Sequence, residues 1–350
     1  MDTEVIATND ASLFETAVAR AAELLRAGQL VALPTETVYG LAANAWNADA
    51  VRRIFEAKGR PPQNPIIVHV ASLELARRCV SDWPPLAAKL AGAFWPGPLT
   101  LVLPRSPEIP DVVTAGGGTV GVRWPSHPFI QAVIRACGFP LAAPSANRSN
   151  QISPTNAKHV RKDLGGRIPL IVDGGPSQVG IESSVLDLAC SPPRLLRPGM
   201  IHIESLLAAM GGSALQTSAP GSSGGAETLL RSPGLLPKHY SPKATLVLLQ
   251  WRDENDLAAQ ISIYPIQRDR IHVIAHHAIP LRRNFGRVAV LPHDAEAFAR
   301  AIYAELHQCD EAGAELIVVE APPTGEEWRG IADRLTRASG GASRYLGGHS

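Results

Sequence analysis

Short runs of β-branched and aliphatic residues alternate with longer amphipathic helical patterns along this chain of 350 residues. Such alternation predicts an α/β fold, in which helices connect the strands of a sheet. A capping box of Ser12 and Glu15 would begin the first helix, and a second helix would begin near Asn47 or Asp49 and end at Gly59. In the first 210 residues we expect strands at 29–33, 65–70, 99–103, 119–122, 170–172 and 184–188, and helices at 12–28, 47–59, 73–79, 129–137 and 156–164.

Residues 211–227 consist mainly of Gly, Ser, Ala, Thr and Pro, carry almost no charge and show no hydrophobic period. This composition is typical of a flexible linker. We therefore predict a first domain at 1–210, a linker and lid at 211–242, and a C-terminal domain at 243–350. In that last domain, expected strands at 245–249, 272–274, 288–291 and 316–319 and helices at 295–308 and 326–338 predict a parallel, Rossmann-like sheet.

The charge and cysteine content exclude several classes of protein. Lys and Arg number 33 and Asp and Glu 32, so the net charge of +1 argues against a simple polyelectrolyte partner. The four cysteines are far apart and form no metal-ligand or disulfide pattern. The acidic N-terminus carries no signal-peptide pattern, and no run approaches a membrane span, so we expect a cytoplasmic protein without a membrane partner.

Two apparent motifs are decoys. Gly116, Gly118 and Gly121 satisfy the dinucleotide-binding pattern, but they run into the β-like residues 119–123 and not into a helix. A Walker-type phosphate loop is absent from the sequence, so any ATP chemistry must use another scaffold. The pair His276 and His277 lacks metal-ligand spacing, which favours surface or hydrogen-bonded structural histidines.

Polar and charged groups lie beside Gly and Pro at the ends of the expected strands, where α/β folds usually carry function. Each segment alone is explained equally well by a turn, a helix cap or a cation at a helix end. Their coincidence in one chain predicts a binding site. The segments are 34–40, 58–61, 119–125, 143–149, 180–184, 196–199 and, beyond the linker, 232–242.

These residues carry a resemblance to a known family. The chain resembles the long form of the YrdC-like family, the threonylcarbamoyl-AMP synthases, over roughly residues 28–199 and again from 233 onward. The matching segments are Pro-Thr-Glu-Thr-Val-Tyr-Gly at 34–40, Lys-Gly-Arg at 58–60, Pro-Gly-Pro-Leu-Thr at 96–100, Val-Arg-x-Pro at 122–125, Ser-Ala-Asn at 145–147, and Pro-Gly-Leu-Leu-Pro-Lys-His-Tyr-Ser-Pro at 233–242.

The resemblance implies a twisted open α/β sheet around a central concave cavity, followed by a smaller Rossmann-like α/β domain. It implies a nucleotidyltransferase that forms L-threonylcarbamoyl-adenylate and pyrophosphate from L-threonine, bicarbonate and ATP. Mg²⁺ would enter with ATP, held mainly by the nucleotide phosphates, and no prosthetic group is implied. The product would pass to a downstream tRNA threonylcarbamoyl transferase, which modifies the adenosine next to the anticodon.

The family motifs assign roles to individual residues. The implied catalytic residues are Lys58, Arg60, Ser145 and Asn147. The implied ATP contacts are Lys58, Arg60, Pro62, Thr119, Ser145, Ser153, Arg197, His239 and Tyr240, the last two as part of a lid. The implied L-threonine contacts are Thr35, His69, Arg123, Ala143 and Ser183.

Two alternatives stay open at this point. One is a module of the same fold that binds double-stranded RNA or tRNA without turnover, through a local basic run, although such a run is more often a solvated helix face. That run comprises Arg148, Lys158, His159, Arg161, Lys162 and Arg167. The other is a domain that forms a carbamoyl-adenylate on another amine, as in hydrogenase maturation, but this sequence lacks the length and cysteines of such proteins.

Overall fold

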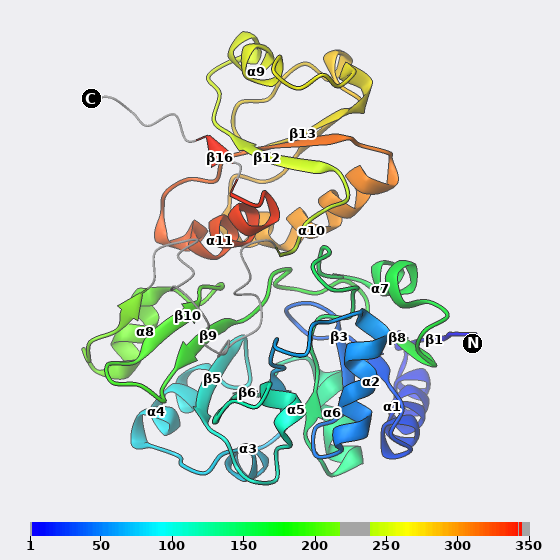
Figure 1. The fold of residues 1–350 in the computed structure, drawn as a ribbon, viewed down its shortest axis with the longest axis vertical. Helices are drawn as coiled ribbons and strands as arrows, with labels where there is room; N and C mark the ends of the chain where they lie inside the picture. Colours follow the sequence, from blue (N-terminus) through cyan, green and yellow to red (C-terminus); the bar gives the residue numbers. More distant parts are fainter. Residues whose placement is uncertain (1, 218–238, 342, 345–350) are drawn as a thin grey trace. The chain divides into compact units, whose positions relative to one another are not determined.

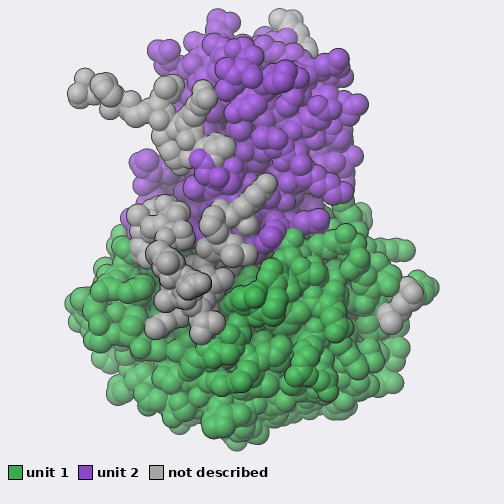
Figure 2. Space-filling view, viewed as in Figure 1, with its two compact units in different colours: residues 1–149, 153–235 green, residues 150–152, 236–350 purple. Residues whose placement is uncertain are grey.

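The computed structural model describes residues 2–217, 239–341, 343 and 344. The chain divides into two compact units, coloured separately in Figure 2. Unit 1 comprises Met1–Ser149 and Ser153–Leu235, and unit 2 comprises Asn150–Ile152 and Leu236–Ser350. The short segment Asn150–Ile152 belongs to unit 2 because Gln151 forms a parallel bridge with Ser241. Most of the predicted linker and lid, 211–242, lies outside the described residues.

Unit 1 is built on a mixed sheet of eleven strands in the order β1-β8-β2-β3-β7-β4-β6-β5-β9-β10-β11 (Figure 1). Its elements are β1 (Glu4–Ala7), α1 (Ala11–Arg26), β2 (Val31–Leu33), β3 (Gly40–Asn44), α2 (Ala48–Lys58), β4 (Val68–His69), α3 (Leu73–Cys79), α4 (Pro85–Phe94), β5 (Leu99–Pro104), α5 (Asp111–Thr114), β6 (Thr119–Arg123), α6 (Pro128–Cys137), β7 (Leu141–Ala142), α7 (Ala157–Leu164), β8 (Leu170–Asp173), β9 (Ser184–Asp187), β10 (Arg194–Arg197), α8 (Ile203–Met210) and β11 (Gln216–Thr217).

Helices cover both faces of this sheet. Successive side chains of a strand point to opposite faces, and β2 shows the consequence. Val31 and Leu33 join a buried cluster with the apolar faces of α1 and α6. Ala32 joins a second cluster, on the other face, with side chains of α2, α4 and α8. The sheet is therefore the middle layer of three, and both of its faces are desolvated.

The second helix of unit 1 positions the first basic segment. Asn47 caps α2, since its side chain accepts hydrogen bonds from Asp49 N and Ala50 N. The apolar side of α2 packs on β3 (Figure 1). Gly59 ends the helix in the left-handed conformation (φ +61°), which glycine adopts without steric cost. Lys58 is thus the last residue of a helix fixed at both ends.

Unit 2 has a five-stranded sheet in the order β14-β13-β15-β12-β16. Every pair of neighbouring strands is parallel, which confirms the predicted Rossmann-like arrangement. Its elements are β12 (Thr245–Leu249), α9 (Glu254–Ile261), η1 (Arg268–Arg270), β13 (Ile271–Ala275), η2 (Arg282–Asn284), β14 (Arg287–Val290), α10 (Ala295–Glu311), β15 (Leu316–Glu320), η3 (Glu326–Trp328), α11 (Arg329–Ala338) and β16 (Ser343–Arg344).

The structure corrects several element predictions. Asp10, and not Ser12, caps α1, because its side chain accepts the hydrogen bond from Leu13 N. The strand expected at 65–70 shrinks to Val68–His69. Sequence analysis missed β3, whose Gly-Leu-Ala-Ala-Asn contains no β-branched residue, and α4, which begins at consecutive prolines without a side-chain cap. It also missed α8 and α9.

No helix among the described residues is long and apolar enough to cross a membrane.

Removal of the α2 cap should destabilise the protein measurably. Asn47→Ala leaves the N–H groups of Asp49 and Ala50 without their acceptor, so we expect the free energy of unfolding to fall by about 1 kcal/mol. Urea unfolding of the full chain measures this loss. Asn47→Asp keeps an acceptor oxygen and should retain most of the stability; an equal loss in both variants would contradict the capping role.

Candidate active site

Two loops that are distant in sequence lie side by side at the start of β3. Ala146 N donates a hydrogen bond of 2.7 Å to Tyr39 O. Gly40 and Ser145 form an antiparallel bridge. The Pro-Thr-Glu-Thr-Val-Tyr-Gly and Ser-Ala-Asn segments, both singled out in the sequence, are therefore joined through their backbones.

Lys58 ties α2 to the Ser-Ala-Asn loop. Its buried Nζ donates to Ser145 O at 2.6 Å, to Asn147 O, and to Asn147 Oδ1 at 3.3 Å. Ser145 Oγ donates to the same Oδ1 at 2.6 Å. Burial first, and then the charge of Arg60, hold the pKa of Lys58 well below its usual value, while Asp163 opposes them. Three of the four predicted catalytic residues thus form one hydrogen-bonded group.

Arg60 is also buried, two residues beyond the end of α2. Its Nε donates to Asn64 O at 3.2 Å, and its Nη2 donates to Pro65 O at 2.8 Å. The guanidinium therefore braces the loop that leads into β4. Pro62, which the family resemblance assigned to ATP, is exposed at the tip of this loop.

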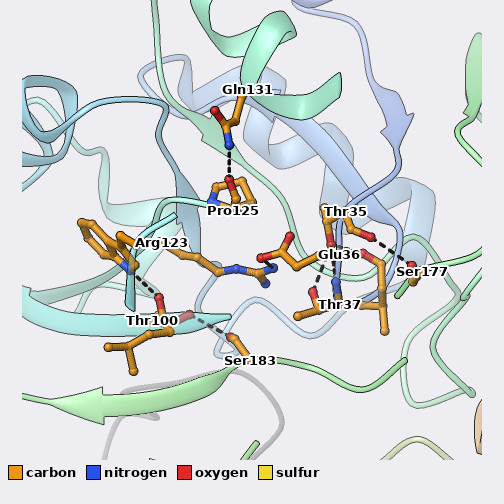
Figure 3. Close-up of polar contacts among 12 residues, drawn as sticks. Thr35, Glu36, Thr37, Thr100, Arg123, Pro125, Gln131, Ser177 and Ser183 are labelled. Atoms are coloured by element: carbon orange, nitrogen blue, oxygen red, sulfur yellow. Dashed lines mark hydrogen bonds and ion pairs between the residues drawn. The ribbon is translucent and has the colours of Figure 1, made fainter. Parts of the chain in front are cut away.

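Arg123 and Glu36 point toward each other in the interior of unit 1 (Figure 3). Arg123 Nη2 lies 2.7 Å from Glu36 Oε1, and both side chains are only 4% exposed. Apart from this contact, the carboxylate oxygens of Glu36 and the Nε and Nη2 atoms of Arg123 have no hydrogen-bond partner within the described structure.

His69 lies beside this ion pair, because β4 places it in register with Arg123 on β6. Burial, and then the positive charge of Arg123, lower the pKa of His69 to about 3. The imidazole is therefore neutral at physiological pH. Its Nδ1 atom is buried and has no hydrogen-bond partner in the described part of the chain.

Ser183 connects two strands to a second arginine. Its Oγ lies 2.8 Å from Thr100 Oγ1 and accepts a hydrogen bond of 3.1 Å from Arg197 Nη2, while its carbonyl oxygen accepts from Arg197 Nε at 3.1 Å. The backbone after Arg197 approaches closely, since a Cβ at Gly199 would lie 2.5 Å from Ser184 N. Only glycine permits this contact, which holds Arg197 against Ser183.

The predicted threonine contacts Thr35 and Ala143 are buried near these groups. Thr35 Oγ1 donates to Val38 O at 2.6 Å, and Thr35 O accepts a hydrogen bond of 3.0 Å from Ser177 Oγ (Figure 3). Ala143 N donates to Ile67 O at 3.1 Å. Both residues are thus fixed by their own backbone surroundings.

Two predicted nucleotide contacts are placed differently. Thr119 begins β6 and is half-buried, so about 13 Å of strand separates it from Arg123 at the other end. Ser153 is fully buried, and its Oγ donates to Glu182 Oε1 at 2.5 Å.

His239 and Tyr240 belong to unit 2, and the residues immediately before them lie outside the described structure. The two rings contact each other at 4.0 Å between centroids. Tyr240 is 1% exposed, stacks on Tyr303 and lies under the guanidinium of Arg334, 5.5 Å from the ring centroid. Its φ of +61° is rare for a residue with a side chain.

Histidines of both units have structural roles. In unit 1, His159 is buried and accepts from Thr155 N, so it is wrongly included in the predicted basic run. In unit 2, His276 is buried, and its Nδ1 lies 2.8 Å from Nδ1 of His293, as expected for a hydrogen-bonded histidine. The other members of the basic run are exposed: Arg148, Lys158, Arg161, Lys162 and Arg167.

Sequence analysis gave no role to Glu36, Thr100, Ser177 or Glu182, although each contacts a predicted site residue. The signal for Glu36 was a carboxylate between two threonines at a strand end. Thr100 and Glu182 lie in segments that the sequence singled out, at 96–100 and 180–184, whereas Ser177 resembles an ordinary loop residue. Within residues 2–217 and 239–344, apart from 342, no group of three or more His, Cys, Asp or Glu residues is arranged to hold a metal ion.

Comparison with known families covers nearly all of the chain. Residues 23–199 match a family model described as "Telomere recombination". Residues 201–340 match a model described as "Threonylcarbamoyl-AMP synthase, C-terminal domain".

Two full-length relatives are similar to this chain. A threonylcarbamoyl-AMP synthase of Bacillus subtilis is 41% identical over 97% of this chain and 96% of its own length. One of Pyrococcus abyssi is 39% identical over 91% of this chain and 93% of its own length.

Two solved structures of P. abyssi Sua5, each 36% identical, share the fold. One is complexed with L-threonine and has a TM-score of 0.88, covering 98% of this chain and 99% of its own. The other is a double variant in which a consecutive histidine and tyrosine are replaced by alanine; its TM-score is 0.89, with 99% of both chains covered.

The neutral state of His69 makes stability depend on pH. The folded state keeps the His69 pKa near 3, whereas the unfolded chain takes up a proton below about pH 6.5. Stability due to this group is therefore complete above pH 6.5 and falls with decreasing pH toward 3, by up to about 1.4 kcal/mol per pH unit.

Urea unfolding between pH 7 and 4 gives the slope of the free energy of unfolding against pH. The difference in this slope between wild type and His69→Gln isolates the contribution of His69. We expect a shallower slope in the variant. Identical slopes would contradict a buried, neutral His69.

Proposed function

The chain belongs to the threonylcarbamoyl-AMP synthase family, in its long form with a C-terminal domain, and from this premise we propose the reaction of unit 1. It forms L-threonylcarbamoyl-adenylate and pyrophosphate from L-threonine, bicarbonate and ATP, as a nucleotidyltransferase. The observation that carries the proposal is the buried Arg123, which pairs with Glu36, lies in register with His69 and keeps its Nε without a hydrogen-bond partner in the described structure.

The amino-acid pocket consists of Arg123, Thr35, His69, Ala143 and Ser183. A guanidinium fork suits a carboxylate, so Arg123 would bind the α-carboxylate of threonine. The neutral His69 would offer its free Nδ1 to a polar group of the substrate. The 36% identical P. abyssi Sua5 complexed with L-threonine supports a threonine pocket in this fold.

The nucleotide pocket combines cations with small polar groups. Lys58 brings positive charge to the Ser-Ala-Asn segment, Arg60 brings it to the loop before β4, and Arg197 brings it to Ser183. Further ATP contacts would be Pro62, Thr119, Ser145, Asn147 and Ser153. Because ATP and a carboxylate are both anionic, their approach requires such neutralising groups in a site with little water. Mg²⁺ would arrive as the counterion of ATP.

The reaction proceeds by positioning. Arg123 holds the threonine carboxylate and leaves the α-amino group free; once this group has released its proton to solvent, it condenses with bicarbonate with loss of water. An oxygen of the resulting N-carboxylate then attacks the α-phosphorus of ATP, the bond to the β-phosphate breaks, and pyrophosphate leaves. We assign no covalent nucleophile. The protein contributes orientation and electrostatic stabilisation of the transferred charge.

His239 and Tyr240 would act as part of a lid during this reaction. Lids that exclude water protect intermediates prone to hydrolysis, such as this mixed anhydride. Tyr240 is a firm anchor for one end of that segment, because its ring is buried in unit 2 beside Tyr303 and Arg334. The double variant of P. abyssi Sua5 has alanines at a consecutive histidine and tyrosine.

The product would serve tRNA modification next to the anticodon, through a downstream threonylcarbamoyl transferase in the cytoplasm. RNA binding is a second candidate function, favoured by the exposed cations on and around α7, which are Arg148, Lys158, Arg161, Lys162 and Arg167. Salt-sensitive binding of tRNA or double-stranded RNA would support it, without excluding the synthase reaction.

Pyrophosphate release tests the proposed reaction. Purified protein with ATP, Mg²⁺ and bicarbonate should release pyrophosphate when L-threonine is added, with much less release for L-serine and for no amino acid. Release that is indifferent to the amino acid would contradict the proposal.

Replacement of Arg60 should impair the reaction more than the fold. Arg60→Met removes a cation expected to contact phosphate, so we expect threonine-dependent pyrophosphate release to fall roughly 100-fold. Arg78→Met, which removes an exposed ion pair between Arg78 on α3 and Glu108, is the control and should keep wild-type turnover. Near wild-type turnover of Arg60→Met would contradict the assignment of Arg60 to the nucleotide pocket.

A further inference from the structure

The backbone of unit 1 holds Glu36 in a fixed position. Val179 N donates to Glu36 O at 2.7 Å, and Gly180 N donates to Thr37 O at 3.1 Å. Ser177 Oγ donates to the carbonyl oxygen of Thr35, the residue before Glu36. These three hydrogen bonds come from one segment, so the carboxylate of Glu36 is presented by a clamped loop.

Arg123 is equally fixed. It ends β6, its carbonyl oxygen accepts a hydrogen bond of 2.9 Å from Val70 N, and its backbone lies in register with His69. The 2.7 Å contact between Arg123 and Glu36 therefore joins two rigid supports. The side chains of Arg123 and Glu36 therefore already hold their positions in this structure.

The charges of this pocket cancel. Arg123 carries +1 and pairs with Glu36, and the neighbouring His69 is neutral at physiological pH. His127, which faces Glu36 from the start of α6, also has a pKa lowered by burial, with Glu36 opposing that shift. The pocket is consequently close to net neutral, even though it contains a buried arginine.

The pocket nevertheless has unfilled donors and acceptors. Glu36 Oε2, Arg123 Nε and His69 Nδ1 are buried without a hydrogen-bond partner in the described structure, whereas Glu36 Oε1 and Arg123 Nη2 contact each other at 2.7 Å. Buried polar atoms normally have partners, so this group suits a polar ligand. A ligand that offers both donors and acceptors but no net charge, such as an α-amino acid zwitterion, matches it better than an anion does.

We propose that Glu36 is a specificity-determining residue, which neutralises Arg123 and thereby reserves this pocket for the zwitterionic amino acid against the anions of the reaction. This inference rests on the proposed function. ATP, pyrophosphate and bicarbonate are all anionic, and an unneutralised buried arginine would bind a phosphate through two parallel hydrogen bonds. Glu36 disfavours this because its carboxylate beside Arg123 repels a phosphate, whereas the ammonium group of a zwitterion offsets that repulsion.

Inorganic phosphate is the probe that tests the proposal. In Glu36→Gln, Arg123 loses its counter-charge, so phosphate should become a competitive inhibitor against L-threonine at saturating ATP. We expect the ratio of the phosphate inhibition constant to the threonine KM to fall at least tenfold relative to wild type. Glu36→Asp keeps the negative charge on a side chain one methylene shorter. This ratio should therefore fall less than in Glu36→Gln, because phosphate is still partly excluded.

Two controls separate specificity from folding. Glu305→Gln breaks another Arg–Glu pair, with Arg287 in unit 2, and should leave phosphate inhibition at its wild-type level. The double variant Glu36→Gln/Arg123→Gln removes both charges, and calorimetric titration with inorganic phosphate should show weaker binding than in Glu36→Gln. Thermal unfolding of every variant shows which of them are folded.

Folded Glu36→Gln or Glu36→Asp with a wild-type ratio would overturn the proposal and leave Glu36 a purely structural partner of Arg123. If Glu36→Gln does not fold, Glu36→Asp decides alone. Failure of the proposed function is a different result, since wild-type protein itself would then show no threonine-dependent pyrophosphate release.

Discussion

Burial of positive charge is the constraint on which the organisation of unit 1 depends. Lys58, Arg60, Arg123 and Arg197 are all at most 7% exposed, and a buried charge is costly unless it is paired or hydrogen-bonded. Backbone carbonyl groups satisfy most of this requirement. Lys58 binds the Ser-Ala-Asn loop, Arg60 braces its own loop, and Arg197 holds the backbone of Ser183. Arg123 differs, because a carboxylate balances it.

The fold supplies these interactions through a mixed sheet with short strands. β4 and β7 contain two residues each, so the loops around them begin close to the sheet centre. The backbones of neighbouring loops can then form hydrogen-bonded bridges, such as the one between Gly40 and Ser145. Helices on both faces exclude water from these strands. A desolvated interior strengthens electrostatic interactions, which is what a reaction between anions requires.

Local patterns in the sequence predicted much of this architecture. The helix from Asn47 to Gly59 and the strand from Thr119 to Arg123 were recognisable because capping residues and β-branched runs act locally. Pairing of Glu36 with Arg123 was not predictable in this way, since it arises from loops brought together by the sheet. The same holds for the neutral state of His69, which depends on burial beside Arg123.

The central claim is that unit 1 joins the carboxylated amine of threonine to the α-phosphate of ATP. The most direct measurement is incubation of the full chain with ¹³C-bicarbonate, L-threonine and MgATP, followed by mass spectrometry of the nucleotide products. We predict an adenylate that carries both threonine and one ¹³C atom in its carbamoyl group. An adenylate of threonine without the labelled carbon, or hydrolysis of ATP to unmodified AMP alone, would contradict it.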